Sequence, residues 1–140
     1  MCRKVTQRTE LFVPPRDILS LEDVEYRLEL DGPYRISQVH GYTMRGQLSC
    51  GGTALSAEIW AIEDCCAVER QNWPEPLTYD QELPIYFWQE DGQCMLWVFV
   101  HGQVYHIQLF ADSDAAMAAV EPQLQQLLLE AAHRLIVGAA

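Results

Sequence analysis

The chain has 140 residues, of which 49% are hydrophobic and 21% charged, and its formal net charge is −11 at pH 7. This length and hydrophobic fraction predict one folded domain with a sizeable core and exclude a disordered chain. The acidic balance disfavours nucleic acid and anionic lipid as partners, because both carry negative charge.

The first sixteen residues differ from the rest of the chain. They contain a single acid, Glu10, and four basic residues: Arg3, Lys4, Arg8 and Arg16. Pro14-Pro15 closes this stretch. We therefore expect 1–16 to be a flexible basic tail and 17–140 to form a single acidic α+β domain.

The next part of the chain has the pattern of β-strands. Val24–Leu30 alternates apolar with charged residues, which predicts a strand with one face in water. Tyr34–His40 and Tyr42–Ser49 are two further strand candidates, broken at Gly41. Ala54–Glu63 fits either a strand or a short helix, and its β-branched and aromatic residues favour the strand.

Residues 64–83 form the least regular stretch. Two closely spaced prolines, Pro74 and Pro76, disfavour both a helix and a central strand there. Long irregular loops in compact domains often carry function, which makes Trp73 a candidate contact residue.

Three apolar segments then predict consecutive strands at Ile85–Gln89, Cys94–Val100 and Val104–Phe110. Asp91-Gly92 is a strong two-residue hairpin signal, and His101-Gly102 is a weaker one. With two-residue turns the expected cross-strand pairs are Tyr86 with Trp97, Trp88 with Met95, Trp97 with His106, and Phe99 with Val104.

This register sorts the side chains of the three strands onto two faces. One face is mostly aliphatic and holds Ile85, Phe87, Cys94, Leu96, Val98, Tyr105, Ile107 and Leu109. The other is aromatic with polar tips and holds Tyr86, Trp88, Met95, Trp97, Phe99, His106 and Gln108. A strand that is apolar on both faces requires cover on both sides.

A long amphipathic helix is predicted after the last strand. Asp112-Ser113-Asp114 suits its N-terminus, Pro122 should kink it or begin a second helix, and Gly138 should end it. One apolar stripe recurs at helical spacing: Met117, Val120, Leu124, Leu127, Leu128, Ala131 and Leu135. The expected fold is an antiparallel sheet of about six to seven strands, with this helix packed on the aliphatic face.

No motif predicts catalysis, a metal site or a cofactor. The five cysteines, Cys2, Cys50, Cys65, Cys66 and Cys94, and the four histidines show no zinc spacing and no nucleophile motif. Because no motif of this kind is present, we expect a non-enzymatic protein. No segment reaches the roughly 18 apolar residues of a membrane helix, and no leader pattern is visible, so we also expect a cytoplasmic protein with no membrane partner.

The aromatic face supports two interpretations. It could pack under the N-terminal strands as a second core layer, or it could form a patch that binds a partner or a second copy, together with Trp60. The candidate partner-binding residues are Trp73, Tyr86, Trp88, Trp97 and Phe99. His106, on the same face, is expected to be packed and hydrogen-bonded.

Residues from about Asp91 to Leu135 resemble the closing section of class I type III secretion chaperones. The matching parts are Cys94–Val100, Val104–Phe110, Asp112-Ser113-Asp114 and Leu124–Leu135. Those chaperones usually begin with a long helix, which the segment 1–23 does not supply. The resemblance implies a homodimeric virulence protein that keeps part of a secreted effector extended until export, and it assigns no site residue.

Two other binding functions remain open at this point. The order of strands followed by one C-terminal helix also matches a pleckstrin-homology-like adaptor, in its protein-binding form. The acidic surface equally suits an immunity protein or inhibitor that neutralises a basic toxin. All three alternatives predict a non-catalytic module whose partner is another protein.

Overall fold

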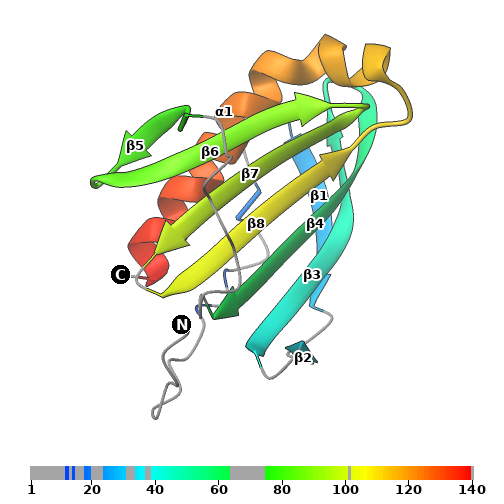
Figure 1. Ribbon diagram of the computed structural model, residues 1–140. Helices are drawn as coiled ribbons and strands as arrows, with labels where there is room; N and C mark the ends of the chain where they lie inside the picture. Colours follow the sequence, from blue (N-terminus) through cyan, green and yellow to red (C-terminus); the bar gives the residue numbers. More distant parts are fainter. Residues whose placement is uncertain are drawn as a thin grey trace.

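The fold is one twisted antiparallel sheet with a single long helix packed across one of its faces (Figure 1). A computed structural model describes residues 12, 14, 18–19, 24–30, 34–36, 39–63, 75–100 and 102–139. The predicted α+β class and the C-terminal helix on an antiparallel sheet are thereby confirmed.

The sheet contains eight strands in the described part of the chain. They are β1 (Val24–Leu30), β2 (Tyr34–Ile36), β3 (Val39–Cys50), β4 (Thr53–Glu63), β5 (Thr78–Asp80), β6 (Leu83–Glu90), β7 (Gln93–Val100) and β8 (Gln103–Phe110). Their order across the sheet is β1-β3-β4-β8-β7-β6-β5, and β2 pairs with β3. Two runs of neighbouring strands, one before and one after residues 64–74, therefore meet where β4 pairs with β8.

The hairpin turns explain why the predicted register of the last strands is correct. Asp91 and Gly92 both have positive φ, as a two-residue turn of this type requires. All four expected pairs are observed, including Tyr86 with Trp97 on β6 and β7 and Trp97 with His106 on β7 and β8. The two faces of this part of the sheet are consequently those that the alternation predicts.

Helix α1 (Asp114–Ala139) begins and ends close to the predicted limits. The Ser113 hydroxyl oxygen accepts a hydrogen bond from the backbone N–H of Ala116 at 3.1 Å, which caps the first turn. The helix is continuous through Pro122, so no second helix begins there. In Figure 1 its axis changes direction within the orange part, which agrees with the kink expected at a proline.

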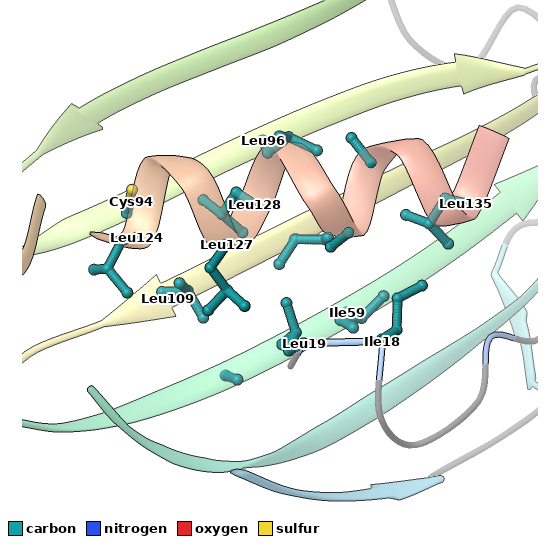
Figure 2. Packing of buried hydrophobic residues seen from close by; sticks show 14 of the residues in the cluster. Ile18, Leu19, Ile59, Cys94, Leu96, Leu109, Leu124, Leu127, Leu128 and Leu135 are labelled. Carbon is teal, nitrogen blue, oxygen red and sulfur yellow. The ribbon is translucent and has the colours of Figure 1, made fainter. Parts of the chain in front are cut away.

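The main core lies between α1 and the aliphatic face of the sheet. Figure 2 shows leucines of the helix stripe, such as Leu127, turned toward Leu109 of β8 and Ile59 of β4. All seven predicted stripe residues are buried, and the cluster continues across β3, β4, β7 and β8. Ile18 and Leu19, which precede the sheet, are also fully buried in this cluster.

Residues near the N-terminus contact the far end of the helix. The backbone N–H of Phe12 donates to the Tyr105 hydroxyl oxygen at 3.1 Å, and the Phe12 ring lies directly against Gly138. Arg134 donates to the carbonyl oxygen of Ile18 at 2.9 Å. Most of the expected tail, 1–11 with 13 and 15–16, lies outside the described residues.

Two details of the strand prediction are wrong. The expected break at Gly41 does not occur, because Gly41 lies inside β3 and pairs with Tyr34 of β2 and Ile62 of β4. A glycine is tolerated within a strand, and the chain instead reverses between Ile36 and Val39. Strand β5 lies in the stretch that was expected to be irregular. The segment 54–63, open to either interpretation, is strand β4.

Candidate protein-binding surface

The face of the sheet opposite α1, here called the outer face, carries a row of aromatic residues across four strands. Register places Tyr86 of β6, Trp97 of β7, His106 of β8 and Trp60 of β4 next to one another in that order. Neighbouring strands lie about 4.8 Å apart. The row is therefore continuous, although its members come from distant parts of the chain.

The rings of this row contact one another directly. The Trp97 ring lies 3.9 Å from the His106 ring and 5.1 Å from the Trp60 ring, the latter in an edge-to-face arrangement. Trp88 stacks on Trp97 with centroids 6.4 Å apart. Such ring pairs each contribute roughly 0.5–1.5 kcal/mol beyond the burial of their area. The rings thus hold one another in place on the outer face.

His106 occupies the centre of the row and is only 3% exposed. Its Nδ1 lies 3.1 Å from the carbonyl oxygen of Leu96, to which the N–H of the neutral ring donates. Burial lowers the pKa of His106 to about 4, against smaller opposing effects of the hydrogen bonds with Leu96 and Gln108. The imidazole is therefore neutral near pH 7. This placement confirms the expectation of a packed, hydrogen-bonded histidine.

Exposure increases from the centre of the outer face toward strand β5. Val104 and Phe99 are 0% and 6% exposed, whereas Tyr86 is partly exposed. Tyr79 of β5, which pairs with Pro84, is 64% exposed, and Leu77 just before it is 43% exposed. The aromatic face is thus a second small apolar layer at its centre and an open surface toward β5.

The charged side chains of residues 75–100, which supply the open part, are all acidic. Residues 75–100 contain no lysine, arginine or histidine. They contain five acidic residues: Glu75, Asp80, Glu82, Glu90 and Asp91. Exposed apolar side chains with an acidic rim favour a partner that is apolar and basic.

A shallow groove lies on the outer face beyond the aromatic row, over β3, β4 and the end of β8. Its volume is about 470 Å³, and its lining includes Arg45, Gln47, Ser56, Glu58 and Phe110. Arg45 and Glu58 form an ion pair across the groove at 3.4 Å. Both are solvent-accessible, so this pair contributes at most about 1 kcal/mol to stability.

Four of the five predicted partner-binding residues lie together on the outer face. Trp88 stacks on Trp97, and Tyr86 meets Phe99 edge to face at 5.9 Å. Trp73 lies outside the described residues. Phe99 is buried and so offers little area to a partner in this conformation. Pattern reasoning missed Tyr79, the most exposed aromatic side chain here, although Thr78-Tyr79 has the residue types of a short strand.

The described cysteines are poor nucleophiles. Burial, with a smaller effect of Glu121, raises the pKa of the Cys94 thiol to about 12, and burial also raises the pKa of Cys50. A protonated thiol is neither a nucleophile nor a metal ligand. Among the residues that the structure describes, no three histidines, cysteines or acids are grouped to hold a metal ion. Cys65 and Cys66 fall outside this set.

No protein-family model, curated protein or solved structure matches this chain. In its described part, no helix combines the length and apolar character needed to cross a membrane. Fold and surface together define an α+β protein with a helix on one face of its sheet and an aromatic cluster on the other.

Proposed function

We propose that this protein is a non-catalytic binding module that holds an extended, basic and apolar segment of another protein on its outer face. The open end of the aromatic surface carries the proposal. There Tyr79 and Leu77 are exposed beside the partly exposed Tyr86, with an acidic rim. Large aromatic side chains supply most of the energy of protein interfaces, since they bury much area at low entropic cost.

Electrostatics supports a basic protein partner over the alternatives. An acidic rim repels the phosphates of nucleic acid and of anionic lipid. It also repels the same surface of a second copy, because residues 75–100 would bring five acids of each copy together without a basic residue. A segment with lysine or arginine between apolar residues suits both the acidic rim and the exposed apolar side chains of this surface.

The physiological role that we propose is a cytoplasmic chaperone of a secreted effector. No helix lies on the outer face among the described residues, and the exposed end of that face toward β5 is where an extended segment would bind. Holding a segment extended is also what the resemblance to secretion chaperones implies. An inhibitor of a basic toxin and a protein-binding adaptor would use the same surface, and the identity of the partner separates the three.

The test is affinity capture from native lysate with matched baits, followed by mass spectrometry. The wild-type bait is compared with a variant carrying Leu77→Ser and Tyr79→Ser, two exposed positions that should not affect folding. Val137→Ser is the control, because Val137 is 54% exposed on α1, away from the outer face. A stoichiometric partner should bind the wild type and the control but not the double variant, and its binding should weaken as salt increases.

The nature of that partner then decides the role. A protein with a secretion signal identifies a chaperone, a toxin or nuclease an inhibitor, and a resident signalling protein an adaptor. A partner that binds all three baits equally would reject the outer face as the binding surface. Activity that depends on Cys65 or Cys66 would reject the non-catalytic proposal.

A further inference from the structure

Strand β5, which carries the exposed end of the outer face, is joined to the sheet by few contacts. It has three residues and lies at the end of the strand order (Figure 1). Its pairs with β6 are Thr78 with Ile85, Tyr79 with Pro84 and Asp80 with Leu83. Just before the strand, the Leu77 N–H donates to the carbonyl oxygen of Ile85 at 2.9 Å. A strand with so few pairs opens at a lower free-energy cost than the centre of a sheet.

The beginning of β6 gives β5 little support, because it lies outside the ladder with β7. That ladder begins at Ile85, which pairs with Val98. The two-residue turn at Asp91-Gly92 makes the even-numbered residues of β6 bond to β7. Pro84 occupies the position that follows in this series, and it has no N–H to donate. Residues 77–84, here called the arm, therefore extend beyond the ladder of β6 with β7.

The turn within the arm is strained. Gln81 and Glu82 have φ values of 49° and 68°, in the left-handed region that is unfavourable for residues with a side chain. The turns at Gly51-Gly52 and Asp91-Gly92 instead contain glycine, which adopts this region freely. A strained backbone persists only where the surrounding structure holds it. Contacts outside the turn must therefore keep the arm in place.

The arm has two such contacts on the helix side. The carboxylate of Asp80 lies 2.7 Å from Nδ1 of His133 on α1, so the ring N–H donates to it, and a protonated ring adds an ion pair. The side chain of Asp80 is only 21% exposed, which reduces the screening of this contact by water. Leu83 packs against the main core as the second contact.

We propose that the arm is hinged at Pro84, that the contact of Asp80 with His133 holds it closed, and that the closed arm presents Tyr79 on the outer face. Side chains alternate along β5, so Asp80 points toward α1 and Tyr79 to the opposite side. Fixing the first therefore fixes the second. His133 is thus a positioning residue that acts on the binding surface from the other side of the sheet. Its role in recognition rests on the proposed function, whereas the movement of the arm does not.

The test measures amide hydrogen exchange of the full chain by nuclear magnetic resonance. His133→Ala removes the contact with Asp80, so exchange at the Leu77 N–H should become about threefold to fivefold faster. Asp80→Ala should have the same effect. The double variant should exchange no faster than either single variant, because the two side chains act through one contact. The amides of β7 are the internal reference and should keep their rates. Gln126→Ala, at an exposed position elsewhere on α1, is the control for changes of the helix surface.

A substitution in the turn should act in the opposite direction. Glu82→Gly relieves the strain and should slow exchange at the Leu77 N–H about threefold, also when combined with His133→Ala. Glu82→Gln removes the same charge but keeps a side chain at this φ, and should leave the rate unchanged.

Two results would overturn the proposal. One is equal exchange at the Leu77 N–H in the wild type, His133→Ala and Asp80→Ala. The other is an equal effect of Glu82→Gly and Glu82→Gln. These rates need no partner, so a failed capture from lysate would reject the binding surface while leaving the hinged arm to be decided by exchange alone.

Discussion

Over strands β6, β7 and β8 both faces of the sheet are mostly apolar, but they are buried in different ways. On the helix side, aliphatic residues such as Leu96, Ile107 and Leu109 meet the stripe of α1 and are fully buried. On the outer face, aromatic residues such as Trp88 and Trp97 lie against one another and stay partly exposed. Aliphatic side chains fill space against a helix, whereas indole and phenol rings combine apolar area with a polar group that tolerates water.

This difference separates stability from recognition within one sheet. The residues at the centre of the helix side lose all solvent contact, so they contribute mainly to the free energy of unfolding. The outer face keeps accessible area toward β5, where a partner can displace water. We therefore expect substitutions on the helix side to act on stability and those near β5 to act on binding.

The largest effect is expected on the helix side, for Leu127→Ala. Leu127 is 0% exposed in the main cluster, so its truncation leaves a cavity and should lower the free energy of unfolding by about 2–5 kcal/mol. Urea denaturation measures this change. The neighbouring exposed Gln126→Ala is the control and should stay within about 0.5 kcal/mol. Equal midpoints for the two variants would contradict the placement of the stripe.

The buried histidine of the outer face should make stability depend on pH. Its pKa is about 4 in the folded protein and about 6.5 in the unfolded chain, so between these values the unfolded state binds more protons. The stabilisation is complete above pH 6.5 and is lost as the pH falls toward 4, by about 3 kcal/mol in total. Urea denaturation at a series of pH values measures the slope.

His106→Gln removes this titration and can still donate to the Leu96 carbonyl oxygen. The difference in slope between wild type and variant isolates His106 from the other histidines of the chain. Parallel pH profiles would mean that the imidazole is accessible to protons in the folded state. The centre of the outer face would then be wet, and the contrast between its buried centre and its open end would not hold.

Trp88→Ala should have an intermediate effect that divides between stability and binding. Trp88 stacks on Trp97 but remains partly exposed, so its loss should cost about 1–2 kcal/mol of unfolding free energy, less than the loss of Leu127. It should also weaken binding of the captured partner about tenfold or more, measured by isothermal titration calorimetry. Trp88→Phe keeps a ring and should lose less of both. A cost equal to that of Leu127→Ala, with binding unchanged, would identify Trp88 as core alone.

Local pattern was sufficient to predict the C-terminal half of the fold. Two-residue turns and strict alternation determine the pairing of β6 with β7 and β7 with β8, and helical spacing determines which side of α1 is buried. Gly41 was misread as a break, because sequence does not show that strands on both sides support the backbone there. Strand β5 was missed because three residues between prolines carry too little pattern.

The composition of the candidate surface depends on pairing between distant parts of the chain. Trp60 joins Trp97 and His106 only because β4 pairs with β8. That pairing follows from how two independent runs of strands meet, and no turn or spacing encodes it. Pattern reasoning therefore predicted an aromatic face. The burial of Phe99 and the exposure of Tyr79 could be recognised only from the assembled sheet.

The smallest effect on stability is expected for Tyr79→Ser, at the open end of the outer face. Tyr79 is 64% exposed on a terminal strand, so the free energy of unfolding should change by no more than about 0.5 kcal/mol. Binding of the captured partner should nevertheless weaken, while Tyr79→Phe, which keeps the ring, should bind nearly as well as the wild type. Titration calorimetry and urea denaturation on the same samples measure the two quantities. Because Tyr79 adds almost nothing to the fold, a loss of binding without a loss of stability would show that this end of the sheet is maintained for recognition. Unchanged binding would instead confine recognition to another surface.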